Sequence, residues 1–334
     1  MTEKLFKALV VEETDDKKYT RQIRNQTIDD LPPGDVVVEV HYSSLNYKDA
    51  LSASGNKGVT RSYPHTPGID AAGVVVESTD SAFKPKDEVI VTSYDLGMNT
   101  AGGFGQYIRI PGQWVVPLPK GLTLREAMCY GTAGFTAALS VFQLTVHGGI
   151  LPEHGEVLVS GATGGVGSIA VAILSKLDYT VVAVNGLVDE SEYLKEIGAQ
   201  RIISIEEATD QSGRPLLKSC WAGSIDTVGG DILATTIKSV NANGVVTTCG
   251  NVASPELPIN VFPFILRGIS LVGIDSQNCP MSRRLKTWDK LADEWKIPMT
   301  ETVVEEITLV DLDQAIDRML HGKHKGRAIV NLRA

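Results

Sequence analysis

The sequence predicts an α/β protein built in two different ways, and three observations support that prediction. Short β-branched runs separated by turn residues occupy the first ~120 positions of the 334-residue chain. From about Val157, short apolar strand candidates alternate with segments of helical spacing, which favours a doubly wound parallel sheet. A glycine-rich turn follows the first of those strands, where such sheets often bind ligands.

The β-rich part is expected to form an irregular barrel or sandwich. Its strand candidates are residues 6–11, 36–41, 73–77, 88–92 and 107–110, with turn residues such as Pro32, Pro33 and Gly34 between them. Thr123 and Glu126 stand three positions apart before an apolar run, which is the pattern of a capping box. A helix is therefore expected to begin there.

The second part alternates between strands and helices. Six strands are expected at residues 157–160, 181–184, 201–204, 224–228, 245–249 and 271–274. Helices are expected at 169–176 and at 190–197, where Gly198 is a C-cap candidate. The tail adds helices at 284–294 and 312–320 and a last strand at 327–332.

Composition and charge exclude several classes of protein. The formal net charge of −9 argues against a nucleic-acid partner, because such proteins usually carry a basic excess. No apolar run approaches the ~20 residues of a membrane span, and no secretory signal opens the chain. The four cysteines, at 129, 220, 249 and 279, are sparse and scattered, which favours a reducing compartment. We therefore expect a cytoplasmic protein with neither a membrane nor a nucleic-acid partner.

The most informative segment runs from Val157 to Ser168, where an apolar strand leads into glycine-rich chain and then a helical pattern. Glycines there let the backbone turn tightly and approach a pyrophosphate, which the N–H groups at the start of the helix bind. The alternative is a purely structural turn. No Gly-Lys-Ser/Thr follows, so it is not a nucleoside-triphosphate loop.

The end of the second strand usually selects between NAD and NADP. An acidic residue there binds the ribose hydroxyls of NAD, whereas an arginine accommodates the 2′-phosphate of NADP. Asn185 is not acidic, and no lysine or arginine follows before Lys195. The motif by itself leaves both cofactors open.

Several blocks of sequence now resemble one family. They are residues 44–49 (SLNYKD), 67–73 (PGIDAAG), 130–137 (YGTAGFTA), 161–167, 225–229, 263–268 and 273–276. With these blocks the chain resembles the medium-chain dehydrogenase/reductase superfamily. More narrowly, it resembles the zinc-independent, quinone-oxidoreductase-like subgroup that includes acryloyl-CoA reductases.

The resemblance implies a domain plan. Residues 1–125 would form a GroES-like catalytic domain and residues 126–276 a Rossmann dinucleotide-binding domain. Residues 277–334 would return to the catalytic domain, with the active site in the cleft between domains. It also implies a homodimer, often formed through the last Rossmann strand, here 270–276.

The same comparison predicts that no metal is used. Zinc-dependent relatives carry Gly-His-Glu where this chain has Gly68, Ile69 and Asp70, and Cys-His where it has Asn46 and Tyr47. The region of their structural zinc cysteines, 95–103, holds no cysteine here. Zinc needs three protein ligands, which Asp70 alone cannot supply. His321 and His324 have metal-like spacing, but a solvated turn is the better interpretation.

The activity implied is reduction of an activated C=C bond in a 2-enoyl (acryloyl-type) CoA thioester, by hydride transfer to the β-carbon. Negative charge then builds on the carbonyl oxygen, where hydrogen-bond donors stabilise it. The resemblance favours NADP(H) as the cofactor. NAD(H) is the alternative, because the basic residues that the subgroup carries near Leu187 and Ile205 are absent. Two other functions stay open: a quinone or enone oxidoreductase, and a non-catalytic NAD(P)-binding sensor or structural protein.

Three residues are candidates for the catalytic group. The Tyr47 hydroxyl would contact the nicotinamide ribose or donate to the substrate, the alternative being a tyrosine packed on the core. Asn46 would donate to the carbonyl or the cofactor amide, or serve only as a turn residue. Asp70 would orient these groups or act as a structural acceptor.

The cofactor is expected to touch a second set of residues. Thr163, Gly164, Gly165 and Val166 would surround the pyrophosphate, with Asn185, Gly186 and Leu187 along the adenosine ribose. Tyr47, Thr132, Asn251 and Ser276 would lie toward the nicotinamide, although Thr132 equally suits a helix cap. Lys195 or Arg201 would substitute for the missing basic residues, or else be exposed charges on a helix and at a strand edge. Arg61, Arg283, Arg284 and Lys286 are candidates for the CoA phosphates, or else form a solvated basic face.

Overall fold

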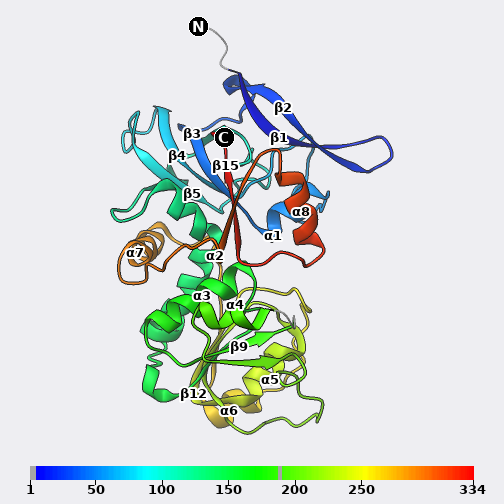
Figure 1. Ribbon diagram of the computed structural model, residues 1–334, viewed down its shortest axis with the longest axis vertical. Helices are drawn as coiled ribbons and strands as arrows, with labels where there is room; N and C mark the ends of the chain where they lie inside the picture. The colour runs from blue at the N-terminus through cyan, green and yellow to red at the C-terminus, as the bar shows by residue number, and fades with distance from the viewer. Residues whose placement is uncertain (1–4, 187–189) are drawn as a thin grey trace. The chain divides into compact units, whose positions relative to one another are not determined.

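The computed structural model describes residues 5–186 and 190–334, which form two compact units (Figure 1). Unit 1 comprises Met1–Thr132, Gln277–Ala292 and Met299–Ala334, and unit 2 comprises Ala133–Ser276 and Asp293–Pro298. The first division falls inside helix α2 (Leu124–Phe142) and the second after Ser276. The sequence-based domain boundaries are 125 and 276.

Unit 1 is built on a seven-stranded sheet in the order β14-β15-β3-β4-β5-β7, with β6 also paired to β3. A separate antiparallel ribbon joins β1 to β2. The strands are β1 (Leu5–Glu13), β2 (Tyr19–Thr27), β3 (Val36–Leu45), β4 (Asp70–Ser78), β5 (Glu88–Thr92), β6 (Tyr107–Ile110), β7 (Val116–Pro117), β14 (Val304–Thr308) and β15 (Arg327–Asn331). The helices are α1 (Tyr47–Ala53), the first part of α2, α7 (Met281–Ala292) and α8 (Leu312–Leu320).

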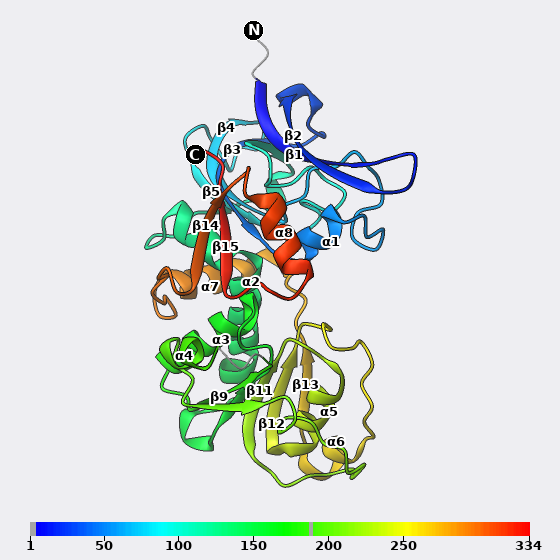
Figure 2. The same cartoon turned by 45° about the vertical axis from the view of Figure 1, so that its right-hand side comes forward.

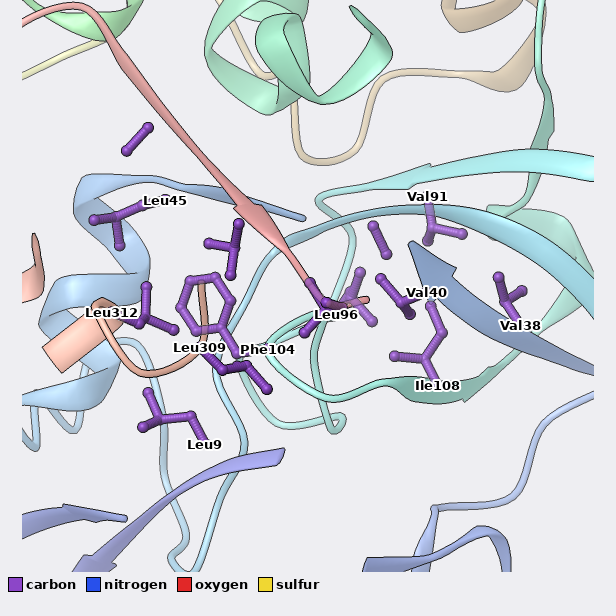
Figure 3. Close-up of a cluster of buried hydrophobic side chains, with 14 of the residues drawn as sticks. Leu9, Val38, Val40, Leu45, Val91, Leu96, Phe104, Ile108, Leu309 and Leu312 are labelled. Carbon is purple, nitrogen blue, oxygen red and sulfur yellow. The ribbon is translucent and has the colours of Figure 1, made fainter. Parts of the chain in front are cut away.

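The core of unit 1 comes from alternate residues of its central strands. Val36, Val38 and Val40 of β3 are buried to 1% exposure or less, as the two-residue period of a strand requires. They pack with Leu96, Phe104 and Ile108 from later segments (Figure 3). Leu309 and Leu312 join the same cluster from the far end of the chain, so unit 1 needs its C-terminal segment to complete its core.

Unit 2 is a six-stranded parallel sheet in the order β10-β9-β8-β11-β12-β13 (Figure 2). Numbered from β8, this is the order 3-2-1-4-5-6 of a dinucleotide-binding sheet. The strands are β8 (Val157–Val159), β9 (Val181–Asn185), β10 (Arg201–Ser204), β11 (Trp221–Asp226), β12 (Val240–Thr248) and β13 (Ser270–Gly273). The helices that connect them are α3 (Gly165–Lys176), α4 (Ser191–Glu196), α5 (Gly230–Ser239) and α6 (Phe262–Arg267).

The predicted fold class is confirmed, and all six predicted strands of the parallel sheet are present. Four unit 1 elements have no counterpart in the sequence-based prediction: the strands β2, β7 and β14 and the helix α1. β2 is a mostly polar strand paired to β1, and β14 has a charged Glu305–Glu306 centre at the edge of its sheet. Neither shows the apolar run on which strand prediction relies.

One predicted helix buries a charge that its sequence does not indicate. Arg284 of α7 is fully buried, whereas the neighbouring Leu285 is 39% exposed. The buried face of α7 contains Arg284, Trp288 and Leu291. Within residues 5–186 and 190–334, no helix has the length and apolar character to cross a membrane.

Candidate dinucleotide loop and buried catalytic cluster

The glycine loop of unit 2 lies where strand β8 passes into helix α3. Gly161 has a φ of 60°, and a Cβ there would stand 2.2 Å from Thr227 Oγ1. Gly167 lies within α3, and its Cβ would stand 2.3 Å from the carbonyl oxygen of Gly161. Glycine is therefore required at both positions, one for the turn and one for close packing of the helix on the loop.

The loop fits a pyrophosphate by its own geometry. Gly164 caps α3 in an extended conformation and contributes no side-chain cap, so the N–H groups of the first turn have no side chain covering them there. The loop lies next to β11, at the point where the strand order reverses. Backbone N–H groups at the start of a twelve-residue helix are suited to bind a diphosphate.

Asp226 ties this edge of the sheet together, and sequence reasoning did not identify it. Its carboxylate accepts hydrogen bonds from Ser160 Oγ at 2.7 Å, Thr248 Oγ1 at 3.0 Å and the Gly229 N–H at 3.0 Å. These donors follow or end three adjacent strands, so Asp226 holds the loops of the site in register. Its position at the end of a wholly buried strand was the available signal.

The other predicted cofactor residues of unit 2 follow the carboxyl ends of their strands. Asn185 ends β9 and Gly186 follows it, beside a cavity of about 360 Å³. Asn251 follows β12, and Ser276 follows β13. Leu187 lies outside the described residues. All the described members therefore lie at the edge of a parallel sheet where ligands bind.

Unit 1 holds a buried polar cluster around Asp70, the first residue of β4. Asp70 has no exposed surface and accepts four hydrogen bonds. The donors are Ser44 Oγ at 2.6 Å, Asn46 Nδ2 at 2.8 Å, the Thr132 N–H at 2.8 Å and Thr132 Oγ1 at 2.6 Å. A carboxylate so fully used holds its neighbours in place and does not contact a ligand directly.

Arg327, at the start of β15, supplies the positive charge of this cluster. It is buried to 2% exposure and donates to Ser44 Oγ at 2.8 Å, Asn46 Oδ1 at 3.2 Å and the Cys129 carbonyl at 3.1 Å. Sequence reasoning missed it, although an arginine at the head of an otherwise apolar strand was a usable signal. The side-chain amide of Asn46 is thereby fixed at both ends, by Arg327 and by Asp70.

Asn46 and Tyr47 begin helix α1, with Asn46 as its N-cap. The Asn46 N–H donates to Asp49 Oδ2 at 2.9 Å, and the Ile69 N–H donates to Asp49 Oδ1 at 2.8 Å. Burial and the nearby charge of Asp70 raise the pKa of Asp49 to about 7. Among the three candidate catalytic residues, Tyr47 is 48% exposed, whereas Asn46 and Asp70 are buried. Of the three, only Tyr47 has a largely accessible side chain.

Thr132 lies directly after a break in helix α2. Gly131 has a φ of 52° and is not helical, so the second part of the helix restarts at Thr132. Asp70 accepts the Thr132 N–H there, which makes it the cap of that restart. A Cβ on Gly131 would lie 2.4 Å from Ser44 Oγ and 2.5 Å from Asp70 Oδ2. The break lets the polar cluster reach the helix.

Several predicted basic residues are already engaged. Arg284 donates to Thr92 Oγ1 at 2.8 Å and stacks on the Tyr94 ring at 4.4 Å, so it does not form part of a solvated face. Lys195 pairs with Glu192 at 2.8 Å, and Arg201 pairs with Glu156 at 2.5 Å. Arg61, Arg283 and Lys286 are exposed.

Two of the four free thiols, those of Cys129 and Cys249, have pKa values raised by burial. Burial raises the pKa of Cys129 to about 11 and that of Cys249 to about 12, which keeps both thiols protonated at neutral pH. In the described part of the chain, no three His, Cys, Asp or Glu side chains group together as a metal site.

Two family models match this chain. The alcohol dehydrogenase GroES-like domain matches residues 32–120, and the zinc-binding dehydrogenase domain matches residues 165–294. The first falls in unit 1 and the second falls largely in unit 2.

Three characterised or solved proteins are similar over the whole length. "Putative quinone oxidoreductase YhfP" of Bacillus subtilis is 45% identical over 98% of this chain and 99% of its own. Its structure with NAD bound superposes with a TM-score of 0.95. "Acrylyl-CoA reductase AcuI" of Ruegeria pomeroyi is 41% identical over 99% of this chain and 100% of its own. The yhdH oxidoreductase of Salmonella enterica, solved with NADP, is 44% identical over 97% of this chain and 99% of that one, with a TM-score of 0.94.

Proposed function

The chain belongs to the medium-chain dehydrogenase/reductase superfamily, and from that premise we propose that it is a zinc-independent, NADPH-dependent reductase of an activated C=C bond. The substrate class is a 2-enoyl (acryloyl-type) CoA thioester. The observation that carries the proposal is the full-length similarity, at 41% identity, to a protein named acrylyl-CoA reductase. The glycine loop, which lies where the strand order of the sheet reverses, supports a dinucleotide as the cofactor.

The bound nicotinamide would supply a hydride to the β-carbon of the substrate, and a proton would reach the α-carbon. The half-exposed Tyr47 is the residue that we propose donates a hydrogen bond to the carbonyl oxygen, where negative charge accumulates. Asn46 and Asp70 would act through it: Asn46 caps the helix that Tyr47 begins, and Asp70 and Arg327 fix the Asn46 amide. Thr132 would be held toward the nicotinamide end by Asp70.

A quinone or enone is the second candidate substrate. The observation that favours it is the quinone-oxidoreductase name of the Bacillus relative, which is 45% identical. NADP(H) is the favoured cofactor, supported by the NADP-bound Salmonella structure, and NAD(H) is the alternative, supported by the NAD-bound Bacillus one.

The function is tested by the rate of NADPH consumption with acryloyl-CoA, with a simple quinone and with a small enone. We expect acryloyl-CoA to be the best substrate by kcat/KM. Tyr47→Phe should lower kcat/KM by roughly 10²–10³-fold, as loss of one donor to a developing oxyanion does. Tyr42→Phe, the same change in strand β3, is the matched control.

The other outcomes of this assay would favour another function or exclude the proposed role of Tyr47. A quinone or enone reduced faster than acryloyl-CoA would favour the second candidate. Binding of NADPH without turnover of any of the three would favour a non-catalytic binding protein. A Tyr47→Phe enzyme as active as the Tyr42→Phe control would remove Tyr47 from the mechanism.

The cofactor assignment is tested by the Kd values for NADPH and NADH. NADPH should bind more tightly, and Leu187→Arg should widen the difference by adding a guanidinium for the 2′-phosphate. If NADH binds at least as tightly as NADPH, the assignment is wrong.

We also propose a homodimer formed through β13 and a cytoplasmic location, with a small-molecule substrate and neither nucleic acid nor membrane as partner. β13 is an edge strand, and just before it helix α6 exposes Ile265 and Leu266 to 67% and 63% and its N-cap Val261 to 63%. A location that keeps thiols reduced agrees with four free cysteines.

A further inference from the structure

A cavity of about 360 Å³ lies at the carboxyl ends of β9 and β10, the place where a dinucleotide sheet usually meets the adenosine ribose. Asn185 and Ser204, the last residues of the two strands, are register partners. Ile205 lies against Gly186, since a Cβ on that glycine would stand 2.8 Å from Ile205 Cδ1. The turn after β10 therefore forms one wall of the cavity, and Glu206 in that turn is part of the lining.

The charge around this cavity is negative. Glu206 is the charged member of its lining. Ile205 also lines a second cavity, of about 350 Å³, whose charged members are Asp231 and Glu256. Among the described residues that line either cavity, none is a lysine or an arginine. A doubly charged phosphate placed there would meet carboxylates without a compensating cation.

The cations nearest in sequence are held elsewhere. Arg201 begins β10 at the end opposite Ser204, where it pairs with Glu156 and stacks on Trp221 at 5.4 Å. Lys195 pairs with Glu192 on α4. In this structure both cations therefore pair with carboxylates that do not line the cavity.

The turn that carries Glu206 is fixed. The Ser204 N–H donates to Glu207 Oε2 at 2.8 Å, and the Glu207 N–H donates to Ser204 Oγ at 3.2 Å. The N–H of Glu206 itself and the Ser204 hydroxyl lower the pKa of Glu206, which keeps its carboxylate charged at neutral pH.

Resting on the proposed function, we propose that Glu206 is a specificity-determining residue that weakens binding of the 2′-phosphate, so that the chain discriminates only narrowly between NADPH and NADH. The carboxylate repels the phosphate, which only NADPH carries at that position. It does not repel the ribose hydroxyls of NADH, because they carry no charge. The remaining parts of the two dinucleotides are identical, so the effect belongs in the ratio of their Kd values.

The test measures Kd for NADPH and NADH by fluorescence titration, at low and at high salt, for wild type and Glu206→Gln. Glu206→Gln keeps the shape of the side chain and removes its charge. Asp178→Asn is the matched control, because it removes one negative charge from an exposed position before the opposite end of β9. Asp178 has a φ of 62°, which asparagine also adopts readily.

We expect Glu206→Gln to lower the ratio Kd(NADPH)/Kd(NADH) about three- to tenfold at low salt, the range for one nearby surface charge. High salt should shrink that difference, because it screens the charge. Asp178→Asn should leave the ratio unchanged. A ratio that changes less than threefold in Glu206→Gln, or changes as much in Asp178→Asn, would overturn the proposal.

The outcomes also separate this proposal from the proposed function. Unchanged ratios in an enzyme that binds both dinucleotides and reduces acryloyl-CoA contradict only the role of Glu206. Failure of the wild-type chain to bind either dinucleotide contradicts both, because there is then no ribose site on which Glu206 can act.

Discussion

Asp70 and Arg327 are oppositely charged side chains, and both are buried in unit 1. They do not pair directly: Ser44 Oγ donates to Asp70 at 2.6 Å and accepts from Arg327 at 2.8 Å. Asn46 joins them in the same way through the two ends of its amide. Because each buried charge is satisfied by named partners, the loss of one leaves the other uncompensated.

Arg327→Met should therefore lower the free energy of unfolding by roughly 3–5 kcal/mol, the range for removing one member of a buried charged network. Urea unfolding followed by tryptophan fluorescence measures it. The matched control is Arg125→Met, which removes an exposed pair with Glu306 at 2.7 Å and should cost about 1 kcal/mol or less. Equal losses in the two variants would show that the buried network does not contribute more than a surface pair.

At this scale the motifs indicated which polar residues lie together but not how buried each of them is. Asn46, Tyr47, Asp70 and Thr132 were all selected by pattern, and the structure brings all four into unit 1. Tyr47 is half-exposed whereas Asn46 and Asp70 are buried, and a motif does not report burial. Arg327 was missed because its contacts join β15 to residues near position 45.

At the scale of elements, the chain around helix α6, just before strand β13, exposes several apolar side chains close together in sequence. β13 pairs with β12 on one side and closes the sheet at that edge. An exposed edge strand beside an apolar helix is a ready template for pairing with a second copy. This gives the proposed dimer a definite surface.

Ile265→Lys should convert the dimer to a monomer, because it places a charge on that apolar surface. Light scattering coupled to size-exclusion chromatography measures the mass. Leu285→Lys, at a 39% exposed position on α7, is the control and should remain dimeric. A wild-type chain that runs as a monomer, or an Ile265→Lys variant that remains a dimer, would contradict the proposed interface.

The strands of unit 2 were predictable because most of them contain a short apolar run with turn residues nearby, whereas its helices α5 and α6 were not predicted. All six lie at the predicted places, give or take a few residues at their ends. The elements of unit 1 were less predictable from the sequence. Strand β2 is largely exposed, and helix α1 is only seven residues long. A polar strand and a short helix are defined by their partners, which local sequence does not show.

At the scale of the whole molecule, two buried histidines make stability depend on pH. Burial, together with the charge of Arg327, lowers the pKa of His324 to about 4 from its usual 6.5. Burial also lowers the pKa of His65. Between pH 4 and 6.5 the unfolded chain therefore binds more protons at His324 than the folded protein does, so this contribution to stability is lost as the pH falls through that range.

His324→Gln should make Tm less sensitive to acid between pH 6.5 and 4, and thermal scans across that range measure it. Asp49 titrates in the opposite sense, since its raised pKa favours the folded state as the pH falls from about 7. Asp49 is present in both proteins, so the difference in Tm between His324→Gln and wild type isolates the contribution of His324. His321→Gln, at an exposed position close by, should keep the wild-type slope, and an equal change in both variants would refute the assignment.

The position of β15 between β14 and β3 has a consequence for synthesis on the ribosome. The parallel sheet of unit 2 has all its strands once residue 273 has been made. Strand β3, made much earlier, lacks its neighbour β15 until residues 327–331 emerge. Translation therefore allows the later-encoded unit to fold first, while the early strands of unit 1 wait with an unpaired edge that chaperones are suited to shield.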